Sequence, residues 1–162
     1  MRRTGLQSVL AIVLMVIAGC GFQLRGTTLF SDNIQVVEIK GIPVNSPLSV
    51  ELTSALIQNG LTVSTTTAER IIVTILSYDT QRTVLSVGTD AKVNEYELRR
   101  QLSFSVSNPQ GEQLLTRQVL NASQDFQEDE AVLGREAEQA LIESQLQSTL
   151  IQQLLRRLAA IQ

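Results

Sequence analysis

The sequence has 162 residues, with 13 Lys or Arg, 16 Asp or Glu and no His, so its formal net charge is −3. The absence of histidine excludes histidine-based triads, His-Glu-x-x-His zinc sites and histidine acid–base catalysis. A mildly acidic chain also lacks the positive footprint of a nucleic-acid-binding protein. We therefore expect neither a nucleic-acid partner nor histidine-dependent chemistry.

The beginning of the chain has the organisation of a secretory signal. Two arginines precede the apolar run Val9–Ala18, which is shorter than the ~20 residues that a membrane-spanning helix needs. The run leads into Ile-Ala-Gly-Cys at positions 17–20, which fits the lipobox of bacterial lipoproteins, where the cysteine is acylated. The alternative is a signal anchor with a buried free cysteine. We expect residues 1–19 to be a cleaved signal peptide and Cys20 to carry the lipid.

Cleavage at this point leaves 143 residues (162 − 19), enough for one domain with a real core. Several acyl chains on one cysteine hold a protein to a bilayer almost permanently. Gly21 stands where an aspartate would favour retention at the inner membrane of a Gram-negative cell, so we expect an outer-membrane anchor and a periplasmic domain. Residues 20–33 show no sustained periodicity and are interpreted as a lipidated tether, and residues 34–162 as a single domain.

The first part of this domain predicts a strand, a helix and a second strand. The β-branched segment 34–40 is typical of a strand that ends at a glycine. Ser46 followed by Pro47 predicts a helix start, because serine caps the free N–H groups and proline is tolerated at the first helical position. The apolar stripe of that helix ends before Gly60, whose tolerance of positive φ suits a helix end. Leu61 and Val63 begin the second strand, and residues 64–67 are expected to be an exposed loop.

The middle of the chain predicts further strands. Residues 71–76 are apolar on both faces, so this strand should lie centrally in the sheet. Residues 83–87 alternate and predict the next strand. Residues 96–106 predict a long strand whose apolar face is interrupted by Arg100. The turn sequence Asn-Pro-Gln-Gly then predicts an antiparallel partner over 113–123.

The last element is a long helix, predicted from about residue 130 to 159. Carboxylates at 128–130 suit the positive end of a helix dipole. Leu141 and Leu155 belong to its apolar stripe and are expected to face the sheet. Together the elements predict an α+β fold, a two-layer sandwich with two helices on one face of a mixed, mostly antiparallel four- to five-stranded sheet in the order β-α-β-β-β-β-α.

Three segments carry a resemblance to a known family. They are the start Cys-Gly-Phe-Gln-Leu-Arg-Gly at 20–26, the strand opening Asn-Glu-Tyr-Glu-Leu at 94–98, and the helix entry at 131–139 with Leu-Leu-Arg-Arg-Leu at 154–158. In this order the chain resembles the LptE (RlpB) family of lipopolysaccharide-assembly lipoproteins. The resemblance implies a non-enzymatic protein that plugs the lumen of the β-barrel LptD, supports barrel assembly and binds lipopolysaccharide for insertion into the outer leaflet.

The same resemblance implies a lipopolysaccharide-binding site. Arg135 matches a basic lipopolysaccharide-contacting position of the family by local alignment. The companion position, in the loop before the Tyr96 strand, is Thr89, with Lys92 as the nearest cation. Two cations at neighbouring loop tips could clamp one phosphate. For each residue taken alone, an ordinary solvated surface role is the alternative.

Other functions remain open at the level of sequence. An ordinary soluble surface explains the Gln, Ser and Thr content as well as a barrel plug does. The alternatives are an accessory lipoprotein of another envelope assembly machine and a lipid-anchored envelope hydrolase, and the absence of histidine and of any nucleophile motif weighs against the hydrolase. The acidic residues at 125–130 lack the spacing and central glycine of a calcium loop. We expect no catalytic residues, no cofactor and no metal.

Overall fold

A computed structural model describes residue 30 and residues 34–89, 91–127 and 132–161, with residues 132–135 described by their backbone alone. Cys20, the predicted signal peptide and all of the predicted tether except Phe30 lie outside the described residues. The secondary structure, in chain order, is β1 (Val36–Lys40), α2 (Pro47–Gln58), β2 (Thr62–Val63), β3 (Ile71–Val87), β4 (Val93–Ser107), β5 (Gln113–Gln127) and α3 (Val132–Ala159).

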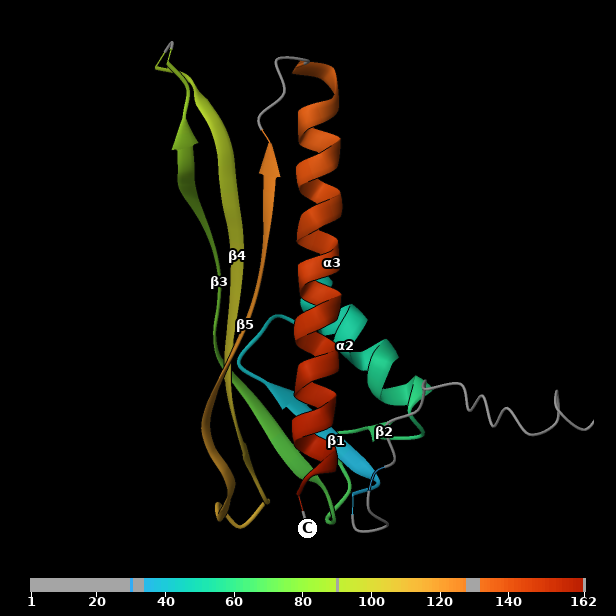
Figure 1. Cartoon of the computed structure of the whole chain (residues 1–162). Helices are drawn as coiled ribbons and strands as arrows, with labels where there is room; N and C mark the ends of the chain where they lie inside the picture. Colours follow the sequence, from blue (N-terminus) through green and yellow to red (C-terminus); the bar gives the residue numbers. More distant parts are fainter. Residues whose placement is uncertain (1–29, 31–33, 90, 128–131, 162) are drawn as a thin grey trace, which may run out of the picture.

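The strands form one mixed sheet of five, in the order β2-β1-β3-β4-β5. β1 is parallel to both β2 and β3, whereas β3, β4 and β5 form an antiparallel meander. The two helices contact each other and share one hydrophobic core with the sheet (Figure 1). The α+β fold predicted from the sequence is therefore confirmed, including the element order and the central position of the strand that begins at Ile71.

The predicted strands 71–76 and 83–87 are in fact one strand, β3. The residues between them pair with β4 in an unbroken register from Ser77 opposite Ser103 to Val84 opposite Tyr96. Most side chains of this middle part are exposed, and its sequence is polar. It therefore lacks the alternation of apolar and polar residues that marks a half-buried strand. The prediction of two strands was wrong because pairing with β4, rather than local pattern, keeps the segment extended.

The first helix begins and ends as its sequence predicts. The backbone N–H of Ser49 donates to Ser46 Oγ at 3.2 Å, and Pro47 is the first helical residue. Gly60 follows the helix with a φ of +84°. The predicted apolar stripe of α2 is buried against the sheet and α3 at three of its four positions, which are Leu48, Leu52 and Leu56.

Gly41 ends β1 at a point where only glycine fits. Its φ is +86°, and a Cβ added there would lie 2.0 Å from the backbone oxygen of Ile75 on β3. The pairing of β1 with β3 stops one residue earlier, at Lys40 opposite Thr74. At Gly41 the chain turns away from β3 while passing close to the backbone of Ile75. Beyond this point β1 no longer lies beside β3 on the side opposite β4.

The buried face of α3 agrees with the predicted stripe at Leu155 and differs from it at Leu141. Leu155 is buried, with 4% of its surface exposed, whereas Leu141 is 58% exposed. Consecutive helical residues point about 100° apart, and Ile142 rather than Leu141 starts the buried row. The buried apolar residues of α3 are Ile142, Leu146, Leu150, Ile151, Leu154, Leu155 and Leu158. The placement of Leu141 on the sheet-facing stripe was wrong.

This difference predicts unequal effects of two leucine truncations on the same helix. Leu155→Ala should lower the free energy of unfolding by about 2–5 kcal/mol, because it leaves a cavity in the core. Leu141→Ala is the matched control and should be near neutral, because its side chain is already exposed. Urea denaturation of the two variants measures this. Equal losses of stability would contradict the burial of Leu155 and the exposure of Leu141.

Candidate functional site

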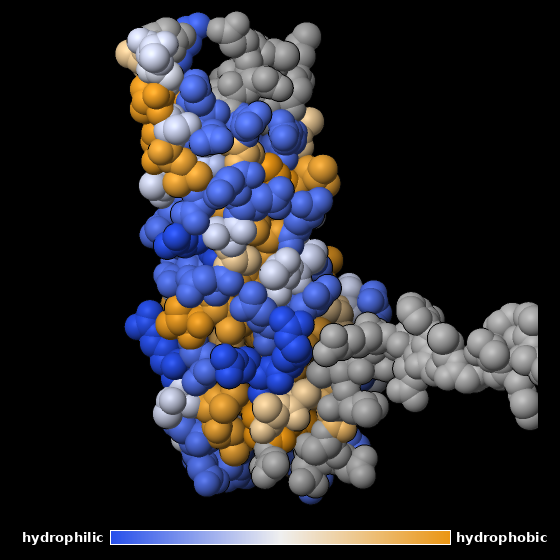
Figure 2. Space-filling model, in the orientation of Figure 1, coloured by the Kyte–Doolittle hydropathy of each residue, from blue (hydrophilic) through white to orange (hydrophobic). Residues whose placement is uncertain are grey.

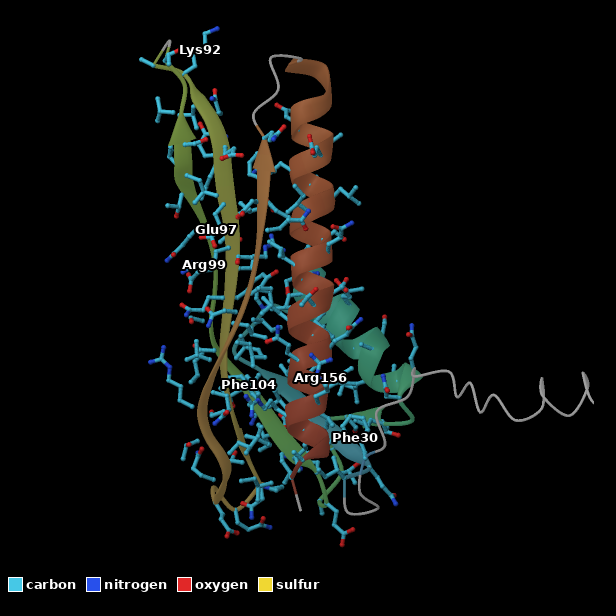
Figure 3. The ribbon with its side chains drawn as sticks, in the orientation of Figure 1. Phe30, Lys92, Glu97, Arg99, Phe104 and Arg156 are labelled. Atoms are coloured by element: carbon cyan, nitrogen blue, oxygen red, sulfur yellow. The ribbon has the colours of Figure 1, made fainter. Side chains whose placement is uncertain are left out.

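The turn between β3 and β4 forms one end of the elongated molecule, and α3 begins at the same end (Figure 1). The turn is closed by backbone hydrogen bonds: Gly88 N–H donates to Lys92 O at 2.7 Å, and Ala91 N–H donates to Gly88 O at 3.0 Å. Thr89 and Lys92 are exposed on it, and Figure 3 shows Lys92 at its tip. The structure thus gives two of the three predicted site residues a common, exposed location.

The third predicted residue, Arg135, lies in the first turn of α3. Its backbone is therefore at the same end of the molecule as the β3–β4 turn, and its side chain is outside the described residues. The amino-terminal end of a helix carries a partial positive charge from aligned peptide dipoles. This end of the molecule therefore combines Lys92, the position of Arg135 and the positive pole of α3.

An aromatic cluster holds the three long strands together below the turn. The guanidinium carbon of Arg82 on β3 lies 3.5 Å from the ring centroid of Tyr96 on β4. The Tyr96 ring stacks on that of Phe126 on β5, with centroids 5.6 Å apart and planes at 22°. Ser86 Oγ adds a hydrogen bond to Glu95 Oε2 at 2.9 Å. Cation–π and stacking contacts of this kind fix the base of the turn.

Arg100 interrupts the apolar face of β4, and its side chain is hydrogen-bonded to residues of α3 and β3. Arg100 Nη2 donates to Glu143 Oε2 of α3 at 2.9 Å, and Nη1 donates to the backbone oxygen of Glu143 at 3.0 Å. On β3, Tyr78 Oη also accepts from Arg100 Nη1 at 2.6 Å, and Thr80 Oγ1 accepts from Nε at 3.0 Å. The guanidinium therefore joins the sheet to α3 with its hydrogen-bonding capacity largely used.

The same network continues into α2. Tyr78 Oη donates to Gln147 Oε1 at 2.8 Å, and burial raises the pKa of the Tyr78 hydroxyl, which keeps it a donor. Gln147 Nε2 and Ser148 Oγ each donate to Glu51 of α2 at 2.5 Å. Buried polar groups are stable when every member has a partner. The cluster therefore fixes how both helices sit on the sheet.

The outer face of the meander is polar and largely neutralised by its own pairs. Arg99 Nη2 lies 2.9 Å from Glu97 Oε2, and Gln101 Nε2 donates to Asn121 Oδ1 at 3.1 Å. Figure 3 shows Glu97 and Arg99 on the side of the sheet away from α3. Figure 2 shows hydrophilic residues interspersed with smaller hydrophobic patches along the molecule. The face is suited to water rather than to lipid.

A separate ion pair secures β1 beside the start of β3. Glu38 is only 6% exposed, and its Oε2 accepts from Arg70 Nε at 2.7 Å. The Arg70 guanidinium holds the pKa of the Glu38 carboxyl below its usual value, with a further contribution from Lys40 at 3.4 Å. Glu38 is therefore a structural residue: its buried charge is balanced by Arg70 and Lys40, and the pair joins β1 to the start of β3.

The described part of the chain also bears on metal sites and on membrane-spanning helices. Among those residues no group of three or more His, Cys, Asp or Glu side chains could hold a metal ion. The helices described here include none that is both long and apolar enough to cross a membrane.

Comparison with known proteins identifies the family. Residues 33–158 match the LptE family model, whose description is lipopolysaccharide-assembly. The chain belongs to the LptE family. The LPS-assembly lipoprotein LptE of Pectobacterium atrosepticum is 28% identical over 155 residues, covering 94% of this chain and 84% of that protein. The LptE of Photorhabdus laumondii is 25% identical over 162 residues, covering 99% and 88%.

Solved structures show that this fold also occurs in proteins with little sequence identity to the chain. The rare lipoprotein B of Shewanella oneidensis superposes with a TM-score of 0.70 at 17% identity, covering 78% of this chain and 95% of that one. A lipoprotein B of Nitrosomonas europaea, solved by NMR, gives 0.69 at 23% identity, with coverages of 86% and 91%. The match to the family model confirms the membership in the LptE family predicted from the sequence.

Proposed function

We propose that this LptE-family protein is a non-enzymatic lipoprotein of the outer membrane, anchored through Cys20, that acts in lipopolysaccharide assembly. In this proposal the domain sits inside the lumen of the LptD barrel, supports assembly of that barrel and binds lipopolysaccharide for insertion into the outer leaflet. Mass spectrometry of the mature chain would detect the acyl groups directly. The observation that carries the proposal is the position of the β3–β4 turn and the start of α3 at the same end of an elongated domain.

The polar outer face of the sheet supports the plug role. The interior of a large outer-membrane barrel is polar and holds water. A plug must therefore present hydrogen-bonding groups without a large excess of charge. The paired side chains of Arg99 with Glu97, and of Gln101 with Asn121, have this character.

The chemistry of the turn end supports lipopolysaccharide binding. Lipopolysaccharide carries phosphate groups, and lysine and arginine are the side chains that bind phosphate most readily. Lys92 is exposed at the turn, and Thr89 beside it adds a hydroxyl that can donate to a phosphate oxygen. Arg135 comes from the helix end whose dipole favours an anion. These groups would bind one amphiphile at the tip of the domain.

The binding site is tested by the double variant Lys92→Asp/Arg135→Asp. Hydrogen bonds to charged groups contribute about 1.5–3 kcal/mol each, and about 1.4 kcal/mol corresponds to a tenfold change in affinity. We expect lipopolysaccharide binding to weaken by roughly one to a few orders of magnitude, and wild-type binding to weaken as salt screens the attraction. Arg156→Asp/Arg157→Asp is the matched control, because it makes the same charge change at the other end of α3.

Normal lipopolysaccharide binding by the folded Lys92/Arg135 variant would reject this site and leave the plug role standing. The plug role has its own test, which is co-purification of the lipidated chain from detergent-solubilised membranes. A co-purifying LptD barrel supports it, for the wild type and for both charge variants. Capture of a different assembly machine without LptD would favour the alternative accessory role.

A further inference from the structure

One edge of the sheet is open over most of its length. β1 pairs with β3 only from Ile71 to Thr74, whereas β3 continues to Val87. In the part of the chain that the structure describes, no strand lies on that side of β3 after Thr74. Figure 1 shows the upper half of β3 as the free margin of the meander, on the side opposite α3. The segment Ser77–Val87 is called the open edge below.

The backbone of the open edge has hydrogen-bonding capacity directed away from β4. In a strand with one antiparallel neighbour, N–H and C=O groups of alternate residues point toward the neighbour, and those of the residues between point outward. An edge of this kind is a template on which another strand can pair. The open edge begins where Gly41 turns β1 away against the carbonyl of Ile75.

From Ser77 to Val84 the open edge carries few of the features that usually protect a sheet edge, whereas beyond Val84 its pairing with β4 is irregular. It contains no proline, and Asp79 and Arg82 are its only charged residues. From Ser77 to Val84 it keeps one uninterrupted register with β4, so it is regular and extended there. Toward the turn it exposes apolar side chains: Val84 is 47% exposed, Leu85 49% and Val87 58%. Isolated soluble domains usually blunt such an edge with charge, proline or a cover.

The opposite edge of the same sheet shows the contrast. β5 is the last strand on that side, and α3 packs along it. Gln153 of α3 donates from Nε2 to the backbone oxygen of Asn121 on β5 at 3.2 Å. A side chain of the covering helix thus bonds the backbone of β5. The remaining terminal strand, β2, has only two residues. The open edge is therefore the long edge at which the sheet can be extended.

We propose that the open edge binds an extended segment of the LptD barrel as an added β-strand. The segment would be polar and mostly uncharged beside Ser77–Thr83, and apolar beside Val84–Val87, to match the side chains on this strand. Main-chain hydrogen bonds would supply affinity, and the change from polar to apolar would set the register. This inference rests on the proposed plug role and names the surface through which the plug is held.

Residue-resolved amide hydrogen exchange tests the proposal, on the chain alone and on its detergent-solubilised complex with co-expressed LptD. In the chain alone, every second amide of the open edge should exchange faster than its neighbours, which are bonded to β4. In the complex, the fast set should slow by about tenfold or more. Amides of β4, which already has strands on both sides, serve as the internal control and should change little.

A pair of proline variants gives a second measurement. Thr80 and Gln81 are adjacent, so one N–H points to β4 and the other to the open side. Proline at the residue whose N–H points to β4 breaks a sheet hydrogen bond and destabilises the fold. Proline at the residue whose N–H points to the open side is tolerated, because that N–H bonds no strand of the sheet. The tolerated variant should fold normally and recover about tenfold less complex than wild type.

The outcomes separate the two proposals. If the complex forms with LptD while the alternate amides exchange as in the free chain, the added-strand inference is overturned and the plug role stands. If no complex forms with wild-type chain, the plug role fails and the inference fails with it. If the alternate amides are already protected in a chain that self-associates by sedimentation, the occupant is a second copy and the inference is also overturned.

Discussion

Replacing Phe104 with alanine should lower the free energy of unfolding by about 3–5 kcal/mol, because the change removes a large buried ring and leaves a cavity. Phe104 lies near the end of β4, is 0% exposed, and pairs with Ile75 on one side and Gln118 on the other. Both neighbouring strands hold it in place, so the backbone has little freedom to collapse into the space. Urea denaturation of the unlipidated chain measures the loss.

Val119→Ala is the control for this prediction. Val119 is on the neighbouring strand β5 and is 46% exposed, so its truncation should stay within about 0.5–1 kcal/mol of wild type. A loss below about 1 kcal/mol for Phe104→Ala would mean that the core is not centred on this ring.

The second large effect is expected from the Arg100 network. Glu143→Leu should destabilise the protein by about 3 kcal/mol, at the lower end of the range for breaking a buried ion pair, because 29% of the Glu143 side chain is exposed. The cost arises because Arg100, whose side chain is only 13% exposed, keeps its charge and loses its carboxylate. Thermal and urea unfolding of the variant would measure it.

The double variant Arg100→Leu/Glu143→Leu gives the decisive comparison. Replacing both members of a buried pair with apolar residues removes the unpaired charge, so the double variant should be more stable than Glu143→Leu. The coupling free energy from the double-mutant cycle should be at least about 1 kcal/mol. Strictly additive losses would show that Arg100 and Glu143 act independently, contrary to the contact described here.

The local signals in the sequence were sufficient for most of the fold. Ser46 with Pro47 and the apolar stripe that follows define α2 through interactions within a few residues of each other, and the structure has them as predicted. The polar middle of β3 has no such local signal, because its extended form depends on pairing with β4. The rotation of α3 likewise depends on contacts with the sheet and α2, which is why Leu141 was assigned to the wrong side.

In the candidate site and the polar network, too, some residues could be found from the sequence, whereas their distant partners could not. Sequence resemblance pointed to Thr89 and Lys92 in a loop, and the loop is the tight turn between two long strands. Arg100 was recognisable as a charge on an apolar face, but its partner Glu143 lies 43 residues away. The link from Gln147 to Glu51 spans 96 residues. No periodicity within one element identifies such partners, since they meet only when the helices pack on the sheet.

The connectivity of the sheet also bears on the order in which the chain folds. β3, β4 and β5 are consecutive and joined by short turns, whereas β1 reaches β3 only across α2 and β2, from Val37 to Ile71. Short loops close sooner than long ones, so we expect β3–β4 amides to gain protection before β1 amides in pulsed exchange during refolding. Under the proposed export through an amino-terminal signal, β1 and α2 would reach the periplasm before the strands that hold them. The first segment to arrive would then become native after the meander that follows it.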